Sequence, residues 1–357
     1  MSARLLISGA GTPASNNLIR SLRAGDPSLR IAGCHSDRFV LRRSDADERY
    51  LIPPSRHPAY GRALSRAIEA ARVDLLIPTS DTDVRAMSRL RRGIPCRLFL
   101  PRHATIEACQ DKYGLSTRLR QRGIPAPLTY VVTDLRRIGG LFRRLPPRSR
   151  VWCRMRTGSG SMGAIPVTKP EQARSWIQRW QAMRRIPVSS FTLSEYLPGR
   201  DFGCQSLWKN GELIVIKTYE RLSYLGMGGN LGVVSSVATL SKTIREPRIV
   251  DICVRAMRAL DPRVSGVFSI DLKENADGVP CITDVNVGRF SSATAVYDMT
   301  GKHNMAIIFV RLALGEPVDL RDEYDVAEDY YVLRDVDMPP SVFHADDFFD
   351  GIEEVRA

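Results

Sequence analysis

Residues 150–163 read RVWCRMRTGSGSMG. The β-branched and aromatic start predicts a strand that carries Arg154, and the loop after it contains Gly158, Ser159, Gly160, Ser161 and Gly163. Glycine lets backbone N–H groups approach phosphate oxygens, serine hydroxyls add donors, and a strand arginine supplies a fixed cation. The stretch therefore predicts a phosphate-binding loop, although a flexible hairpin turn explains this window equally well when it is taken alone. No Gly-Lys-Ser/Thr closes the loop, so it is not a Walker loop.

A second polar set lies in residues 268–286, FSIDLKENADGVPCITDVN. Asp271 and Asp284 fall on two strands joined by a turn, and Asn286 shares a face with Asp284 because side chains alternate along a strand. Oxygen ligands without histidine or cysteine suit Mg²⁺ bound with nucleotide phosphates. The alternative is the polar outer face of a hairpin. We favour the metal site, because apolar neighbours such as Ile270 mark buried strands in which aligned acids need a cation. Arg289 follows as a candidate anion-binding residue.

Two further motifs also have a purely structural explanation. Residues 194–201 predict a strand, a short hinge and a second strand; such a hinge can contact an adenine edge and its acid can hold ribose hydroxyls, but a simple turn explains it alone. Residues 9–14, GAGTPA, fit the dinucleotide fingerprint, with Asp37 after the second strand. We favour turn geometry for these glycines, since Pro13 removes a backbone donor that a pyrophosphate needs.

The composition describes an ordinary globular chain with a basic body. The 357 residues suit two or three subdomains, and hydrophobic and charged residues make up 43% and 25%. The longest apolar runs are too short for a membrane span. Seven scattered cysteines without a CxxC argue against a disulfide framework and a cysteine zinc site, and we expect a cytoplasmic protein.

The net charge of +13 is unevenly distributed along the sequence. Residues 321–357 hold three arginines and twelve acids, which leaves the rest of the chain with 49 basic and 27 acidic residues. A basic body can indicate nucleic acid or polyanionic substrates. We do not expect nucleic acid to be a partner, because the arginines are dispersed along predicted helices and no basic run is interleaved with aromatics. The acidic segment is expected to fold back on the basic body, and salt should then loosen it.

Alternating strands and helices up to residue 101 predict a parallel sheet covered on both faces. The predicted strands of this part are residues 4–8, 31–34, 74–78 and 97–100, with a helix at 59–72. Beyond it, we predict helices at 111–122 and 247–260 and a helix that starts near residue 168. The remaining predicted strands are residues 128–132, 191–195, 201–208, 213–219, 266–273 and 279–285, and a glycine-rich loop is expected at 226–232.

Taken in order, these pieces resemble the ATP-grasp superfamily, and within it the carbamoyl-phosphate-synthetase-like branch. The motifs that carry the resemblance are Asp111-Lys112, RGIPAP at 122–127, RMRTGSGSMG, EYLPGRD at 195–201, IDLK at 270–273 and DVNVGRF at 284–290, and it covers residues 4–314. It implies an α/β and α+β chain, an ATP-grasp fold with an N-terminal Rossmann-like pre-grasp domain. The expected division is 1–105 for the pre-grasp domain, 106–195 for the N-terminal and lid subdomains, 196–320 for the C-terminal subdomain with the metal site, and 321–357 for the acidic segment.

The resemblance also implies roles for individual residues. Lys112 and Arg154 would contact the phosphates under the lid formed by Ser159, Gly160 and Ser161. Adenine would be held by Glu195, Tyr196 and Leu197, and ribose by Asp201. Asp271, Asp284 and Asn286 would bind two Mg²⁺, for which Mn²⁺ can substitute. Arg289 would stabilise the acyl phosphate or its carboxylate, and Lys217 and Arg221 are weaker candidates for the phosphate or acceptor side.

Some positions depart from the family pattern. Arg154 stands where a lysine is usual, Asp284 where a glutamate is usual, and Arg289 is shifted by one residue from the usual Asn-Pro-Arg. A histidine that often precedes the last subdomain is replaced by Asn230. These changes bear on substrate and turnover more than on the fold.

The expected function is that of an ATP-dependent, ADP-forming ligase. It would activate a small-molecule carboxylate as an acyl phosphate and join it to an amine or a thiol. Two alternatives stay open: carbamoyl-phosphate-type activation of bicarbonate or a carbamate, and a nucleotide-binding regulatory protein without catalysis. The expected partners are small-molecule carboxylate and amine substrates and no membrane; the family resemblance is compatible with a homodimer.

Overall fold

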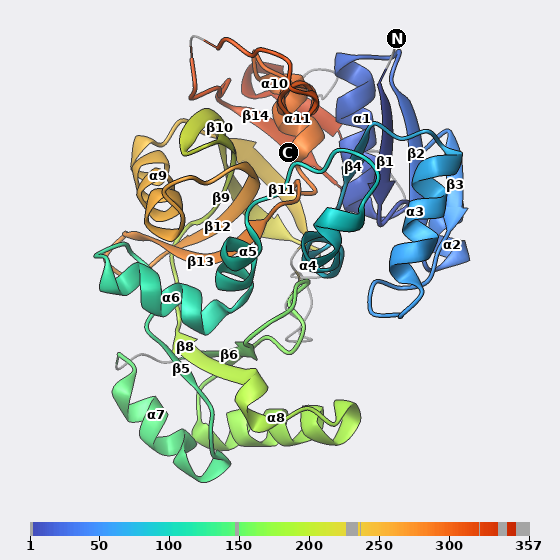
Figure 1. The fold of residues 1–357 in the computed structure, drawn as a ribbon. Helices are drawn as coiled ribbons and strands as arrows, with labels where there is room; N and C mark the ends of the chain where they lie inside the picture. The colour runs from blue at the N-terminus through green and yellow to red at the C-terminus, as the bar shows by residue number, and fades with distance from the viewer. Residues whose placement is uncertain are drawn as a thin grey trace, which may run out of the picture.

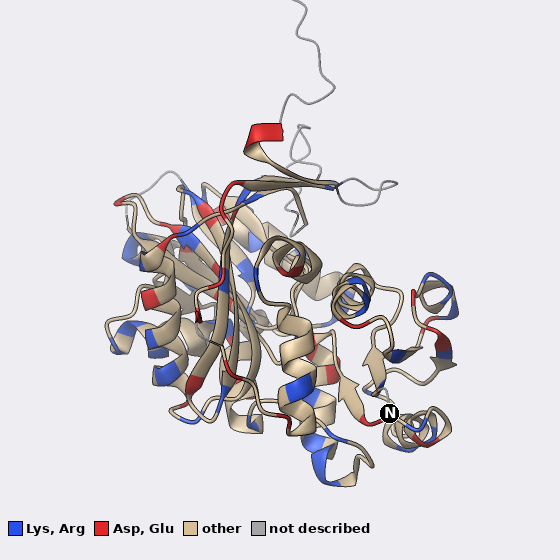
Figure 2. Ribbon diagram, turned by 90° about the horizontal axis from the view of Figure 1, so that it is seen from above, with Lys and Arg blue, Asp and Glu red and all other residues tan. Residues whose placement is uncertain are grey.

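Three β-sheets organise the chain (Figure 1). The computed structural model describes residues 3–146, 150–225, 235, 237–320, 322–334 and 341–347. Within these residues, the helices are all too short or too polar to cross a bilayer. Lysine and arginine are spread over many helices and loops (Figure 2), as expected for a basic composition without one basic stripe.

The N-terminal sheet is parallel and has the strand order β3-β2-β1-β4. Its strands are β1 (Arg4–Ser8), β2 (Arg30–His35), β3 (Glu48–Leu51) and β4 (Leu75–Ile77), and its helices are α1 (Pro13–Gly25), α2 (Arg38–Arg42), α3 (Tyr60–Ala70) and α4 (Asp81–Leu90). The order reverses between β1 and β4, and ligands bind at the carboxyl ends of parallel strands at such a point. The predicted strand at residues 97–100 is wrong: only Arg97 bridges to Leu75, and Pro101 ends the extended run.

The small sheet is antiparallel, with the order β5-β8-β6-β7. Its elements are β5 (Thr129–Val131), α7 (Ile138–Arg144), β6 (Val151–Met155), β7 (Ile165–Val167), α8 (Pro170–Arg184) and β8 (Phe191–Glu195). It has a core of its own, built around Cys153, Ile177 and Phe191. In Figure 1 this unit lies at one end of the molecule, away from the N-terminal sheet.

The large sheet has seven strands in the order β13-β12-β9-β10-β11-β14-β15. Its strands are β9 (Asp201–Lys209), β10 (Glu212–Tyr224), β11 (Ala238–Thr243), β12 (Gly266–Glu274), β13 (Pro280–Val287), β14 (Tyr330–Leu333) and β15 (Ser341–His344). The helices around it are α5 (His103–Gln110), α6 (Lys112–Gln121), α9 (Pro247–Leu260), α10 (Thr294–Thr300) and α11 (Met305–Leu314). The predicted glycine-rich loop at 226–232 and Asn230 lie outside the described residues.

The C-terminal segment is built into the large sheet rather than attached to its surface. β14 pairs antiparallel with β11, and Asp329 in this segment lies 2.8 Å from the Nζ of Lys242. Strands β14 and β15 were not predicted, because the segment was read from its acidic composition and the two β-prone runs within it are short. The domain boundaries and the salt sensitivity of the segment stay predictions.

Two buried clusters join the N-terminal sheet to the large sheet. Leu6 faces a cluster that includes Phe268, whereas its neighbours Leu5 and Ile7 face a second cluster that includes Val267. Adjacent strand residues point to opposite faces, so both faces of each sheet are covered. The shared cores make these two sheets one body, against which the small sheet is packed separately.

Replacing Gly11 by alanine should destabilise the fold strongly. Gly11 has φ +88° at the turn after β1, and a Cβ there would lie 1.8 Å from the carbonyl oxygen of Val40. We expect the free energy of unfolding to fall by more than about 3 kcal/mol in chemical denaturation. Gly123→Ala is the control, since φ is +68° there but a Cβ meets no described atom within 4 Å; it should cost about 1–2 kcal/mol. Equal losses in the two variants would show that the Val40 contact is unimportant.

Candidate active site

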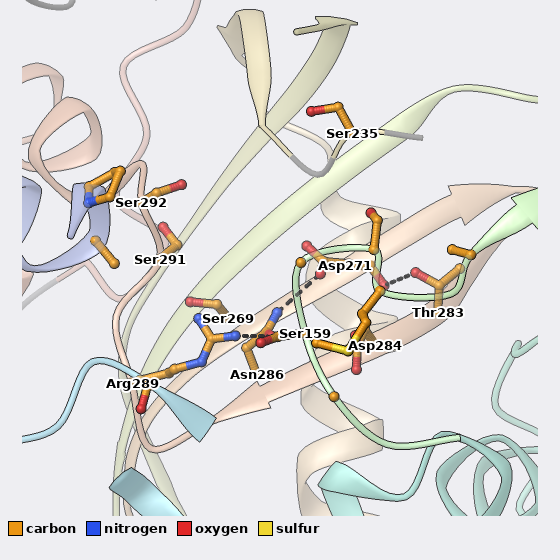
Figure 3. A pocket seen from close by; sticks show the side chains of 18 of the residues that line it. Ser159, Ser235, Ser269, Asp271, Thr283, Asp284, Asn286, Arg289, Ser291 and Ser292 are labelled. Atoms are coloured by element: carbon orange, nitrogen blue, oxygen red, sulfur yellow. Dashed lines mark hydrogen bonds between the residues drawn. The ribbon is translucent and has the colours of Figure 1, made fainter. Parts of the chain in front are cut away.

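A cavity of about 1070 Å³ lies between the N-terminal sheet, the small sheet and the large sheet. The carboxyl ends of β1 and β4 contribute Ser8 and Thr79, the small sheet contributes Arg154, and the large sheet contributes Asp271 and Asp284. Figure 3 shows Asp271, Asp284 and Asn286 on two adjacent strands of the large sheet, Arg289 just beyond the second of them, and Ser159 in the same pocket. The cavity therefore receives side chains from all three sheets.

The β12–β13 hairpin places the predicted metal ligands together. Asp271 and Asp284 are cross-strand partners, and Asn286 lies opposite Ser269 on the same pair of strands. The amide nitrogen of Asn286 donates to Asp271 at 3.0 Å. A register shift between Asp271 and Leu272 leaves Thr283 as an extra residue, and its hydroxyl donates to the Asp271 carbonyl oxygen at 3.1 Å.

A cationic side chain contacts each member of this set. Lys112 Nζ lies 2.6 Å from Asp284 Oδ2, Arg221 donates to Asp271, and Arg289 Nη2 donates to the amide oxygen of Asn286 at 2.5 Å. Burial alone would raise the pKa of Asp284, but Lys112 and Arg154 outweigh it and lower that pKa. Asp284 is therefore an anion, which is the form in which a carboxyl group binds a metal.

Lys112 and Arg154 approach the acids from different elements. Lys112 begins α6, whose N-cap is Asp111, and its backbone N–H donates to the carbonyl of Arg156 at 3.0 Å. Arg156 in turn donates to Asp111 at 2.7 and 2.5 Å, so the strand with Arg154 is tied to the start of α6. Arg154 Nη2 donates to the Thr283 carbonyl at 2.8 Å, while its buried Nε has no hydrogen-bond partner within the described residues. That donor is available to a ligand.

The glycine-serine loop follows β6 and lines the cavity through Gly158, Ser159, Gly160 and Ser161. Both glycines have positive φ, and so does Ser161 at +56°. Cβ atoms at Gly158 and Gly160 would meet no described atom within 4 Å, so open space surrounds this part of the loop. The loop conformation leaves its backbone N–H groups room to face an anion.

The hinge between β8 and β9 forms the wall beside the small sheet. Glu195, Tyr196 and Leu197 line the cavity there, and the Tyr196 ring lies 6.4 Å from that of Trp152. Glu195 Oε2 accepts from the Leu128 backbone at 3.3 Å. Aromatic rings with an exposed backbone edge suit a flat heterocycle.

Asp201 lies at the start of β9 and is already engaged by protein groups. Arg221 donates to it at 2.9 Å, Tyr224 at 2.6 Å and Lys273 at 3.4 Å. Arg221 also contacts Asp271, so one guanidinium joins the predicted ribose residue to the predicted metal site. The predicted site residues of the hairpin, the loop, the hinge and β9 are thus brought to one cavity.

Lys217 is the exception, because the structure places it away from the cavity wall, and its contact with a nucleotide stays a prediction. It does not line the cavity; its side chain is 1% exposed on β10, with Nζ 2.9 Å from Asp325 and 3.6 Å from Asp298. It also donates to the carbonyl oxygens of Tyr297 and His303. Lys217 is a structural cation that joins the C-terminal segment to the α10 region.

The dinucleotide fingerprint also has a structural explanation. Thr12 caps α1, and Asp37 caps α2 by accepting from the backbone of Phe39 and Val40. The tight contact of Gly11 with Val40 accounts for the second glycine. Gly9 and Thr12 nevertheless line the cavity, so the turn still borders the site.

Sequence reasoning missed several residues of the cavity wall. Asp81, which is not itself part of the wall, accepts from Arg289 Nε at 2.5 Å and so positions that guanidinium in the cavity. Asp83, Tyr297 and Arg334 line the cavity, and no local motif marks any of them. Only tertiary contact brings them to the site.

The acids and the amide at the hairpin fit a hard divalent cation. No group of three or more His, Cys, Asp or Glu side chains suited to a metal occurs in the described part of the chain, so a purely protein-built cage is absent there. Mg²⁺ typically uses one or two carboxylates together with substrate phosphates, and two carboxylates beside an amide oxygen match that pattern.

Comparison with known proteins rests on structure alone. No protein-family model and no curated protein matches the sequence. A biotin carboxylase from Campylobacter jejuni, solved as an ATP complex, is similar with a TM-score of 0.71 and 12% identity over 93% of this chain and 75% of that one. An L-amino acid ligase from Bacillus licheniformis has a TM-score of 0.68 and 13% identity over 93% and 79%.

A third similar structure is the biotin carboxylase domain dimer of the Hydrogenobacter thermophilus 2-oxoglutarate carboxylase, in complex with MgADP, ADP and bicarbonate. It has a TM-score of 0.71 and 13% identity over 93% of this chain and 74% of that one. These likenesses confirm the predicted fold class, an ATP-grasp fold preceded by a Rossmann-like parallel sheet.

Proposed function

We propose that this protein is an ATP-dependent, ADP-forming ligase that activates a small-molecule carboxylate and joins it to an amine. The observation that carries the proposal is that each candidate metal ligand in the cavity is in contact with a cationic side chain. Lys112, Arg221 and Arg289 contact the very oxygens of Asp284, Asp271 and Asn286 that would hold a metal. MgATP combines a cation with a polyanion. When MgATP binds, the metal would take the place of the cationic side chains at the aspartates, and the phosphates would take the place of the aspartates at those cations. No charge would then be left unpaired.

ATP and Mg²⁺, or Mn²⁺ in its place, are the proposed cofactors. Asp271, Asp284 and Asn286 would hold the metal, which when bound neutralises phosphate charge. Lys112, Arg154 and the loop at 158–161 would contact the phosphates. The slot beside Tyr196 and Trp152 would take adenine, and Asp201 would take ribose.

The proposed reaction has two displacements. A carboxylate oxygen attacks the γ-phosphorus of ATP, and ADP leaves with the bridging oxygen. The amine nitrogen then attacks the acyl carbon, and phosphate leaves as the amide forms. Positioning and charge neutralisation suffice for phosphoryl transfer, so a dedicated nucleophile is not needed. Lys112, Arg154 and Arg289 supply cations around the transferred group.

Asp83 supports an amine as the second substrate. Its carboxylate lines the cavity and accepts from the Ser8 hydroxyl at 2.9 Å. Among the described residues, no lysine, arginine or histidine forms an ion pair with it. An ammonium or amine group would supply the missing donor charge.

Replacing Asp83 by asparagine should raise the KM for the amine about 10-fold or more, because one charge-assisted hydrogen bond is lost. The KM for ATP should stay the same. Asp45→Asn is the control, since Asp45, which follows α2 and does not line the cavity, forms an ion pair within the described residues only with Arg20, at 3.7 Å. Initial rates of ADP release at varied amine would measure the effect; an equal change in both variants would contradict a role in amine binding.

Carbamoyl-phosphate-type activation of bicarbonate is the second candidate function. The bicarbonate in the Hydrogenobacter thermophilus structure favours it, since that domain has the same fold. A homodimer is a further proposal, supported by the dimer in that structure. A regulatory protein without turnover is the least supported reading, because the cavity keeps the proposed metal ligands together with the cations that pair with them.

The direct test is nucleotide turnover with pooled substrates. Purified protein would be mixed with ATP, Mg²⁺ and separate pools of amino acids, organic acids and bicarbonate, and ADP, AMP and phosphate would be measured by mass spectrometry. ADP that depends on one pool supports the ligase and names the substrate class; dependence on bicarbonate alone selects the second candidate. Release of AMP would contradict the acyl-phosphate route, and no turnover in any pool would favour the regulatory reading.

A further inference from the structure

Two side chains on the cavity wall have hydrogen-bond donors without an acceptor. Arg334 follows β14, and its buried Nε and Nη2 have no hydrogen-bond partner within the described residues. Tyr297 lies in α10 with 2% of its surface exposed, and its hydroxyl has no hydrogen-bond partner there either. Both residues line the cavity. A buried donor without an acceptor costs free energy, so such groups in a cavity indicate a missing ligand.

Arg334 differs from the other cations of the cavity. Lys112, Arg221 and Arg289 each form an ion pair with an aspartate, whereas within the described ranges Arg334 forms none. Burial lowers the pKa of Arg334, which still leaves a guanidinium charged at neutral pH. The wall at this point therefore carries a desolvated positive charge that has no counter-ion among the residues that the structure describes.

Contacts link Tyr297 to the proposed metal site, and Arg334 interacts electrostatically with Tyr219, the ring on which Tyr297 packs. The Tyr297 and Tyr219 rings are 4.9 Å apart at a steep angle. Arg221 Nη2 donates to the Tyr219 hydroxyl at 2.8 Å and also to Asp271. Arg221 and Tyr219 thus link the proposed metal ligand Asp271 to Tyr297. The backbone of Arg334 is fixed by its hydrogen bond to the Thr239 carbonyl at 2.9 Å, next to Ala238, which also lines the cavity.

We propose that Arg334 and Tyr297 form a subsite for a second oxyanion of the substrate, so that the activated acid carries another carboxylate or a phosphate group. The inference rests on the proposed function, because it assigns one carboxylate to the reaction near Arg289 and a second anionic group to this wall. Nε and a terminal nitrogen of one guanidinium can donate two parallel hydrogen bonds to one oxyanion. The Tyr297 hydroxyl adds a third donor.

The donors themselves restrict the chemistry of the ligand. The two guanidinium nitrogens can only donate, and although the Tyr297 hydroxyl could accept, a ligand ammonium placed there would be repelled by the Arg334 charge. Asp83, without a cation partner, belongs to the N-terminal side of the same cavity. The two substrates would therefore be sorted by charge, the amine toward Asp83 and the additional anion toward Arg334.

Binding to matched pairs of acids tests the subsite. The probes are butyrate and succinate, valerate and glutarate, and glycerate and 3-phosphoglycerate, titrated calorimetrically with Mg²⁺ and a non-hydrolysable ATP analogue present. We expect at least one dianion to bind about 10- to 100-fold more tightly than its monoanionic match, and Arg334→Met to abolish the difference. Tyr297→Phe should weaken the same dianion about 3- to 10-fold. The pair that shows the effect distinguishes a carboxylate from a phosphate.

Two controls separate binding from folding. Arg245→Met removes an exposed arginine that stacks on Tyr324, outside the cavity, and should leave every dissociation constant unchanged. The free Arg334→Met protein should have an unchanged or higher Tm, because its side chain makes no hydrogen bond or ion pair with the described residues. A fall in Tm without any change in dianion binding would show a structural role and overturn the subsite.

The remaining outcomes are also decisive. If no dianion is preferred in any pair, or if the preference survives Arg334→Met, the subsite is wrong while the ligase proposal stands. ADP release with the same probes and an amine pool is measured in parallel. Arg334-dependent dianion binding without ADP release in any pool would retain the subsite and contradict the ligase proposal.

Discussion

Asp284→Asn should lower the rate of ADP formation by about 10²- to 10³-fold, the largest effect expected on activity. Asp284 is the acid that Lys112 and Arg154 both approach, and it would be a metal ligand. The amide keeps the shape but loses the charge, so the metal is held less firmly and the two cations lose their common partner. The Mn²⁺ concentration for half-saturation, followed by electron paramagnetic resonance with an ATP analogue bound, should rise at least about 10-fold.

Asp277→Asn is the matched control for this experiment. Asp277 lies in the turn of the same hairpin, is exposed, and contacts only Asn275 among the described residues. Its replacement should leave both ADP formation and Mn²⁺ binding unchanged. Normal turnover in Asp284→Asn would remove the hairpin from the proposed mechanism.

The pKa of Asp284 also has a consequence for pH dependence. Burial raises that pKa, but the neighbouring cations Lys112 and Arg154 lower it by more, so the pKa lies below the ordinary 3.8. The carboxylate therefore stays ionised between about pH 5 and 9, and it should add no step to the pH–rate profile in that range. An acidic limb near pH 6 that disappears in Asp284→Asn would contradict this assignment.

Lys217→Met should produce the largest loss of stability, about 3–5 kcal/mol in the free energy of unfolding. The variant leaves Asp325 and Asp298 buried without the ammonium that lies 2.9 and 3.6 Å from them. It also leaves the carbonyl oxygens of Tyr297 and His303 without their donor. Chemical denaturation would measure the loss, and ATP-analogue affinity of the folded variant should change little because Lys217 is outside the cavity wall.

The loss should depend on pH in a defined direction. Without Lys217, burial and mutual repulsion raise the folded-state pKa of Asp298 and Asp325 above the unfolded values. Protonation then stabilises the folded state, so the deficit is smallest near pH 4 and grows as pH rises. Lys302→Met is the control: its Nζ lies 3.8 Å from Asp322 at an exposed site, and its loss should cost less than about 1 kcal/mol. Equal, pH-independent losses would contradict the buried-pair account.

Local sequence patterns predicted best those helices and strands whose ends are marked by residues within the element or next to it. The helix at 247–260 and the strand at 191–195 have the predicted bounds, because apolar spacing and flanking polar or proline residues mark their ends. The predicted strand at 97–100 was wrong because only Arg97 bridges to β4. The run then ends at Pro101, which has no backbone N–H to donate. Strands β14 and β15 were missed because their β-propensity is confined to four residues each inside an acidic segment.

The residues of the candidate site likewise fall into two groups, those that local patterns identify and those that depend on tertiary packing. Asp271, Asp284 and Asn286 come together through a hairpin with two-residue alternation, which is a local property that a sequence reveals. Lys217 has the same alternation on β10, but which of two buried faces borders the cavity depends on the packing of α10 and the C-terminal segment. Charge and strand position alone therefore did not separate a ligand contact from a buried ion pair.

By itself, the sequence determined most of the elements up to residue 320 and the hairpin that carries the acids, since these follow from short-range periodicity and turn chemistry, and its ordered motifs determined the fold class through their resemblance to a known superfamily. Only the tertiary structure decided which cations meet those acids, that Lys217 faces Asp325, and that Arg334 reaches the cavity from 45 residues beyond Arg289. Ion pairs and cavity walls join side chains that are distant along the chain. Their partners are selected by packing and desolvation, which no local pattern encodes.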